Sequence, residues 1–147
     1  YEYLPEFELN RFEGKRVVDA GAHVGLFSLV ASTFAKEVIS LEPHPVNFKL
    51  LQLNLYINHV QNVIPINKAL WSESKTLTIY EGEHTGAHTL VKNVSNKKFN
   101  VSSITLRDIS DEFGEIDLLK MDIEDAEFEV LSKLDSKILK NIRNIVA

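Results

Sequence analysis

Residues 17–28 read VVDAGAHVGLFS, and this stretch decides the fold of the chain. The run RVVDA (16–20) is apolar and rich in β-branched residues, which is typical of a strand buried on both faces. Gly21 and Gly25 then allow a tight turn. The apolar residues from Val24 to Phe34 recur with helical spacing. A strand, a glycine-bearing turn and a helix in this order are typical of the ligand-binding edge of an open α/β sheet.

The remaining sequence alternates between predicted strands and helices. Strands are predicted at 37–43, 62–70, 116–122 and 141–147, and helices at 45–59, 105–113 and 125–134. This alternation predicts one α/β domain over residues 1–147, with a mostly parallel sheet of order 3-2-1-4-5 whose strands begin near 16, 37, 62, 116 and 143. Short β-patterns between Lys75 and Leu106 predict an antiparallel excursion beside or over that sheet.

Composition narrows the class of protein. The chain has 147 residues, enough for one domain and too few for two, and its net charge of −5 argues against nucleic-acid binding. There is no cysteine, which excludes disulfides and thiolate metal sites and suits a cytoplasmic protein. The most apolar long window, 24–41, contains Lys36 and Glu37, so no membrane span is predicted. The chain begins with Tyr1, as an excised fragment would.

The turn lacks the glycines of a dinucleotide fingerprint. G-x-G-x-x-G starting at Gly21 would need glycine at positions 23 and 26, which are His23 and Leu26. Asp19, just before the turn, disfavours a pyrophosphate and favours a cationic ligand. S-adenosylmethionine carries an ammonium and a sulfonium and no phosphate, and therefore fits. A tight turn without a ligand is the alternative.

Glu42 strengthens the prediction of a cofactor. It ends the second predicted strand, 23 residues after Asp19 (42 − 19), so both carboxylates reach the same edge of the sheet. A carboxylate at this place can accept hydrogen bonds from both ribose hydroxyls. NAD also carries a ribose, so a nicotinamide-dependent dehydrogenase stays open as an alternative.

The end of the fourth predicted strand carries the candidate catalytic residues. Lys120 lies in a strand that is otherwise apolar, and lysine is rarely buried unless paired, which predicts a polar partner at the ligand edge. Asp122 and Glu124 follow at the carboxyl end, where catalytic residues of such sheets collect. Acids in the first turn of the next helix are explained by the helix dipole. Two carboxylates could hold Mg²⁺, but no third ligand is evident and no metal site is predicted.

Five blocks of the sequence resemble, in this order, those of the FkbM-type S-adenosylmethionine-dependent methyltransferases. The blocks are VVDAGAHVGLFS (17–28), EPHPVNFKLLQLNL (42–55), NKALW (67–71), SITLRDI (103–109) and IDLLKMDIEDAEFEVL (116–131). The resemblance extends from about Phe7 to Ala147. It implies a Rossmann-like class I methyltransferase fold, S-adenosylmethionine as cofactor, and methyl transfer to a hydroxyl oxygen of a small molecule or of a sugar or lipid acceptor.

The resemblance also assigns roles to single residues. It matches Asp19, Gly21 and Gly25 to the donor-binding turn, Glu42 to the ribose acid, Asn67 to the loop that meets the adenine, and Lys120, Asp122 and Glu124 to the block after the fourth strand. His23, inside the turn, joins the predicted cofactor-binding residues, with helix capping as its alternative role. In the predicted mechanism, Asp122 or Glu124 accepts the hydroxyl proton during an in-line displacement, and Lys120 orients the acid or the acceptor.

Three features depart from the family pattern. The family usually has Asn in place of His23 and Gly in place of Asp125, and its domains continue with a last antiparallel strand pair that is not present here. These departures motivate a second alternative, a non-catalytic module that binds the cofactor. An exposed fifth strand would also favour association of copies of the chain.

Overall fold

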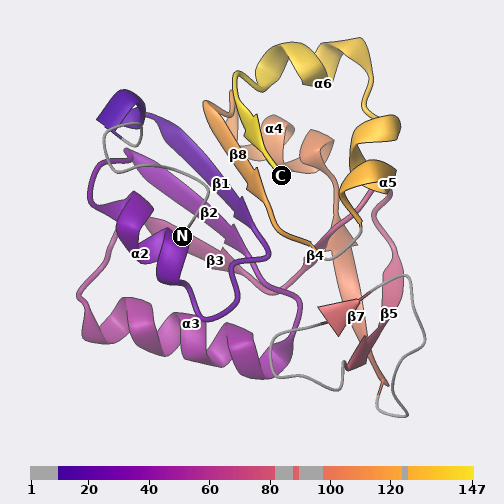
Figure 1. Cartoon of the computed structure of the whole chain (residues 1–147), viewed down its shortest axis with the longest axis horizontal. Helices are drawn as coiled ribbons and strands as arrows, with labels where there is room; N and C mark the ends of the chain where they lie inside the picture. The colour runs from indigo at the N-terminus through magenta and orange to yellow at the C-terminus, as the bar shows by residue number, and fades with distance from the viewer. Residues whose placement is uncertain (1–9, 82–87, 90–97, 124–125) are drawn as a thin grey trace.

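The computed structural model describes residues 10–81, 88–89, 98–123 and 126–147 (Figure 1). In chain order the elements are η1 (Asn10–Phe12), β1 (Arg16–Ala20), α2 (Leu26–Ser32), β2 (Glu37–Leu41), α3 (Pro45–Ile57), β3 (Val63–Ile66), β4 (Ala69–Leu70), β5 (Thr76–Glu81), β6 (His88–Thr89), β7 (Lys98–Ile104), α4 (Leu106–Phe113), β8 (Leu118–Met121), α5 (Glu127–Ser132), α6 (Ser136–Asn141) and β9 (Ile145–Val146). No helix among these residues is long and apolar enough to cross a membrane.

Five strands form the main sheet in the order β3-β2-β1-β8-β9, and all neighbouring pairs are parallel. The predicted order 3-2-1-4-5 is therefore confirmed, because β8 and β9 are the fourth and fifth strands of that prediction. The order reverses between β1 and β8, so the carboxyl ends of these two strands flank the switch point at which such sheets bind ligands.

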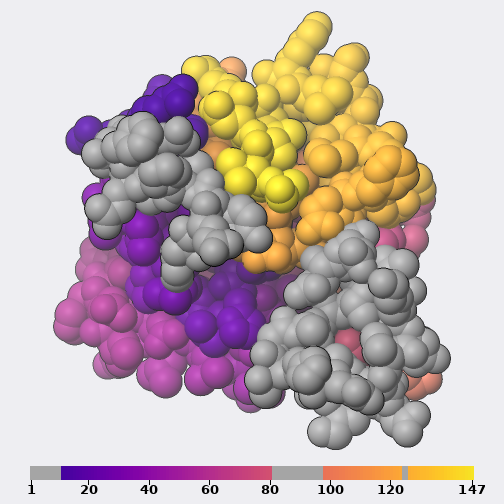
Figure 2. Space-filling view, viewed as in Figure 1, coloured from indigo at the N-terminus to yellow at the C-terminus, as the bar shows by residue number. Residues whose placement is uncertain are grey.

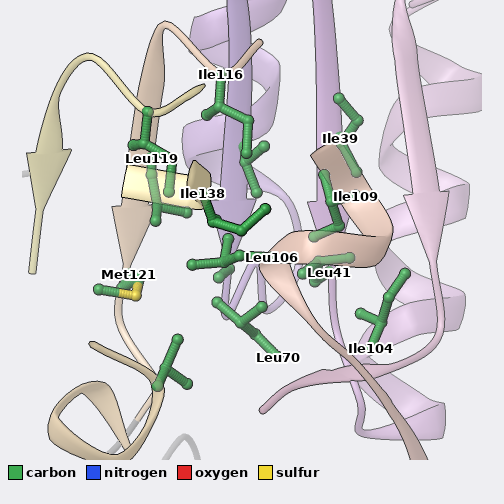
Figure 3. Packing of buried hydrophobic residues seen from close by; sticks show 14 residues of the cluster. Ile39, Leu41, Leu70, Ile104, Leu106, Ile109, Ile116, Leu119, Met121 and Ile138 are labelled. Atoms are coloured by element: carbon green, nitrogen blue, oxygen red, sulfur yellow. The ribbon is translucent and has the colours of Figure 1, made fainter. Parts of the chain in front are cut away.

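The central strand β1 is covered on both faces, which explains its unbroken apolar sequence. Val17 packs in one cluster with residues of α2 and α3 such as Ala31 and Leu51. Val18 and Ala20 belong to a second cluster, with α4 and α6, on the opposite face of the sheet. Figure 3 shows side chains of α4 lying among those of β2 and β8 in this second cluster. Fully burying one such side chain contributes about 1.5–3 kcal/mol.

Helix α3 buries only one of its faces. Leu51 and Leu55 point into the core, while Val46, Leu53 and Ile57 are exposed. The helix forms the magenta surface at the lower left of Figure 2. Pro45 occupies its first turn, as predicted, and the preceding His44 accepts a hydrogen bond from Asn47 N–H through its ring nitrogen.

A second sheet has the order β4-β7-β5-β6 and contains the predicted excursion. β5 pairs antiparallel with β6 and with β7, which confirms the antiparallel part of the prediction. β4 pairs parallel with β7, however, so the excursion is not antiparallel throughout. The predicted third strand, 62–70, is divided into β3 and β4 because Asn67 and Lys68 leave the main sheet between them.

The end of the chain also differs from the prediction. The predicted last strand began near residue 143, but β9 covers only Ile145–Val146. Helix α6, which was not predicted, precedes it. Asp135 begins this helix, and its carboxylate accepts hydrogen bonds from the N–H groups of Lys137 and Ile138.

The first turn of α4 is fixed by reciprocal capping. Thr105 Oγ1 accepts from Asp108 N–H, and the Asp108 carboxylate accepts from Thr105 N–H. Ser74 Oγ, from the loop after β4, donates to the same carboxylate over 2.6 Å. The Ser74 hydrogen bond and the Thr105 N–H lower the pKa of Asp108 below its ordinary value of 3.8.

Asp108→Asn should therefore destabilise the chain in a pH-dependent way. A carboxylate with a lowered folded-state pKa contributes stability above its unfolded pKa, and this contribution is lost as pH falls through the folded-state pKa. Urea unfolding at pH 6, 4 and 2.5 should give a difference in the free energy of unfolding between parent and variant that is largest at pH 6 and becomes smaller below about pH 4. A difference that stays constant over this range would contradict the role of the ionised carboxylate.

Candidate active site

The predicted site residues gather at the carboxyl edge of the main sheet because β2, β1 and β8 are parallel neighbours in register. Asp19 of β1 stands opposite Ser40 of β2 and opposite Lys120 of β8. Ala20, Leu41 and Met121 are paired and end β1, β2 and β8 at the same level. Glu42 and Asp122, which follow β2 and β8, therefore lie on either side of the glycine turn that follows β1.

The two glycines of the turn are required by close packing. Gly21 has φ of +79°, and a Cβ placed on it would lie 1.9 Å from the carbonyl oxygen of Asp122. Gly25 has φ of +89°, and a Cβ there would lie 2.3 Å from Cδ1 of Leu51. The first glycine thus lets the ends of β1 and β8 meet, and the second lets α2 begin against α3.

Glu42 ties the glycine turn to the start of α3. The residue is only 4% exposed, and its carboxylate accepts hydrogen bonds from His23 N–H over 2.7 Å and from His44 N–H over 2.8 Å. The backbone of His23 is in the left-handed region, with φ of +53°, and its side chain is exposed. The turn that carries the predicted donor site is therefore held in place by the residue predicted to bind the ribose.

Asp19 lies beneath the turn and is fully buried, at 0% exposure. One carboxylate oxygen accepts from Ser28 Oγ over 2.6 Å, and Ser28 Oγ lies 2.6 Å from Ser40 Oγ. Since Ser28 gives its single hydroxyl proton to Asp19, Ser40 must donate to Ser28. The other carboxylate oxygen forms an ion pair with the Lys120 ammonium, 3.1 Å away. Contact between Asp19 and a cofactor stays a prediction.

Ser28 and Ser40 were not among the predicted site residues. Both are fully buried, Ser28 in the apolar helix α2 and Ser40 in the apolar strand β2. A small polar residue inside an apolar run is the only sequence signal that they give, and it is weak because serine hydroxyls often bond to a nearby backbone carbonyl instead. We call Asp19, Ser28, Ser40 and Lys120 the buried polar cluster.

Lys120 has the polar partners that the sequence predicted. Its side chain is 15% exposed, and its ammonium donates to the carbonyl oxygen of Gly21 over 3.2 Å besides pairing with Asp19. The ammonium lies 3.9 Å from a carboxylate oxygen of Asp122 and 5.8 Å from the ring centre of Phe27. A buried carboxylate needs such a partner, because an unpaired charge in the interior is strongly unfavourable.

Among the described acids of this edge, Asp122 is the accessible one, with 64% of its side chain exposed. The side-chain amide of Asn67, which follows β3, donates to the carbonyl oxygens of Glu42 and Pro43 and so fixes the loop after β3 to the loop after β2. The predicted residue Glu124, and Asp125 next to it, lie outside the described residues. Within the described part of the chain, no three His, Asp or Glu side chains are grouped as a metal site would require.

The packing at Gly21 makes a specific prediction about stability. Gly21→Ala should lower the free energy of unfolding by about 1–2 kcal/mol because alanine is strained in the left-handed region. The clash of the new Cβ with Asp122 should lower it by a further ~1–3 kcal/mol or more. Gly14→Ala is the matched control, because Gly14 also has a positive φ (+69°) but has nothing within 4 Å of an added Cβ. Urea unfolding should show that the free energy of unfolding falls clearly more for Gly21→Ala than for Gly14→Ala. Equal decreases would mean that the ends of β1 and β8 do not meet as described.

The chain is similar in sequence and in structure to proteins that are described as methyltransferases. The family model described as Methyltransferase FkbM domain matches residues 19–147. Methyltransferase sdnD from Sordaria araneosa is 30% identical over 166 residues, and the match covers 88% of this chain and 64% of sdnD. The chain thus spans a little less than two thirds of this relative.

Two solved structures share the fold. The FkbM methyltransferase of Methylobacillus flagellatus KT superposes with a TM-score of 0.57 at 18% identity, over 80% of this chain and 28% of that one. SMU.1697c of Streptococcus mutans, solved in complex with SAH, gives a TM-score of 0.54 at 13% identity, over 93% of this chain and 63% of that one. The strand order, the glycine turn and the family match lead to one conclusion: the chain belongs to the FkbM methyltransferase family.

Proposed function

We propose that this chain binds S-adenosylmethionine at the glycine turn and transfers its methyl group to a hydroxyl oxygen of a small molecule or of a sugar or lipid acceptor. The observation that carries this proposal is the charge of the carboxyl edge. Asp19, Glu42 and Asp122 meet there with a single lysine, Lys120, among the site residues. Such an edge favours a ligand with positive charge and disfavours a pyrophosphate.

The residues present fit this cofactor in kind and position. Glu42 stands at the end of β2, where a carboxylate can accept from ribose hydroxyls, and Asn67 is anchored to the same loop. The backbone of Gly21 and His23 would meet the methionine part of the cofactor. When bound, S-adenosylmethionine supplies a methyl group on a sulfonium, which is already a good leaving group.

The chain's own residues then have three tasks. They must hold the acceptor oxygen in line with the methyl group, keep water out, and take up the hydroxyl proton. Asp122 is suited to take the proton because its carboxylate is exposed at the edge. Lys120 is suited to positioning, because its ammonium is held by Asp19 and by the carbonyl oxygen of Gly21. Glu124 is the other candidate base.

The nicotinamide alternative is less well supported. A dinucleotide turn uses its second glycine to let the backbone approach the pyrophosphate, whereas the corresponding position of this turn, counted from Gly21, is His23. Calorimetry should give saturable binding of S-adenosylhomocysteine and at least tenfold weaker binding of NAD. Equal affinities, or binding of NAD alone, would overturn the proposed cofactor.

Glu42→Gln should weaken binding of S-adenosylhomocysteine by about 1.5–3 kcal/mol, the range for hydrogen bonds to a charged group. Glutamine keeps the size of the side chain and one oxygen that can accept from a backbone N–H. Glu115→Gln is the matched control, because Glu115 is exposed and pairs with Arg143 near the opposite end of β8. Unchanged affinity in the Glu42 variant would remove this residue from the cofactor site.

Asp122→Asn should behave differently from the Glu42 variant. If Asp122 is the general base, affinity for S-adenosylhomocysteine stays nearly unchanged and turnover falls roughly 10²–10⁴-fold. Turnover can be followed as transfer of a radiolabelled methyl group to a panel of hydroxyl-bearing acceptors. Normal turnover in the variant would move the role to Glu124. Donor binding by the parent without transfer to any acceptor would favour the non-catalytic alternative.

A further inference from the structure

A second concave site lies on the side of the chain that carries α4, α5 and α6. It is a pocket of about 380 Å³ formed by the loop after β4, the first turn of α4 and the corner between α5 and α6. None of the predicted donor-site residues lines it. Its volume lies within the range of about 300–1,000 Å³ that is typical of small-molecule sites.

The pocket combines an apolar base with an aromatic wall. Leu106, Val130 and Ile138 line it and are almost completely buried. Figure 3 shows Leu106 and Ile138 close to each other in the core cluster beneath. Trp71 contributes a partly exposed indole, whose Nε1–H is buried and has no hydrogen-bond acceptor among the described residues.

The cations at the pocket are already paired with acids. Arg107 pairs with Asp135, Lys133 lies 2.9 Å from Glu129, and the neighbouring Lys75 lies 3.2 Å from Glu73. Hydrogen bonds favour the ionised form of two of these carboxylates: backbone N–H groups, that of Ile138 above all, lower the pKa of Asp135, and the Ser72 hydroxyl lowers the pKa of Glu129. An anionic ligand would therefore have to displace a carboxylate from its cation. This argues against phosphates and carboxylates as ligands.

Several hydrogen-bonding groups of the pocket are acceptors. Ser74 gives its hydroxyl proton to Asp108, and Ser72 gives its proton to Glu129, which leaves the serine oxygens as acceptors beside the carboxylates. A ligand that uses these acceptors brings donors of its own. Neutral hydroxyl groups on a ring with an apolar face meet this requirement, because the ring can pack on the indole and on the apolar base.

We propose that this pocket binds a neutral ring compound that carries several hydroxyl groups, at a site separate from the donor turn. The site does not depend on the proposed methyl transfer, because none of its residues takes part in donor binding. The ligand is a small molecule that binds independently of the methyl donor.

The single tryptophan of the chain makes the test direct. Trp71 emission should change saturably with methyl β-glucopyranoside and should respond at least tenfold more weakly to glucose 6-phosphate, with or without saturating S-adenosylhomocysteine. No saturable response to the glucoside, or equal responses to both sugars, would overturn the proposal.

Asp135→Asn tests the charge argument in the same assay. Asparagine caps helices as well as aspartate does, so α6 should persist, but Arg107 loses its partner. The variant should bind glucose 6-phosphate at least tenfold more tightly than the parent does. Glu115→Gln, which frees Arg143 away from the pocket, is the control and should leave both responses unchanged. An unchanged preference in the Asp135 variant would contradict the proposal even if S-adenosylhomocysteine binds as expected.

Discussion

The ion pair between Asp19 and Lys120 joins the two central strands of the sheet, and the arrangement of the site depends on it. The carboxylate is completely buried and needs a cation, and of the two strands that pair with β1 it is β8 that places one opposite Asp19. With Lys120 opposite Asp19, the backbone after β8 reaches the backbone of Gly21, and Asp122 emerges beside the glycine turn. The need of the buried Asp19 carboxylate for a cation thereby determines which residues lie beside the glycine turn at the carboxyl edge of the sheet.

The main sheet was predictable because its signals are local and strong. The apolar run RVVDA is buried on both faces, and the single lysine in the apolar strand β8 has the polar partner that its surroundings required. The parallel order followed from the alternation of strands and helices. The predicted residues of β1, β2 and β8 lie at one edge for the same reason, since parallel strands end together.

Other features depend on contacts that no local pattern reveals. β3 and β4 are separated at Asn67, although the sequence there is compatible with one continuous strand. The chain leaves the main sheet at this residue because its side-chain amide donates to two carbonyl oxygens of the loop after β2. Ser28 and Ser40 are distant in sequence and meet only when α2 packs on β2. Helix α6 is short, and its start depends on a single capping residue, Asp135.

In the part of the chain that the structure describes, the second sheet is not strand-paired with the main sheet. β4 is only two residues long and pairs with the end of β7. The ring centres of Phe99 in β7 and of His44, two residues after Glu42, lie 4.8 Å apart in an edge-to-face contact. Changes in the strand pairing of the second sheet can therefore leave the register of β1, β2 and β8 at the glycine turn unchanged.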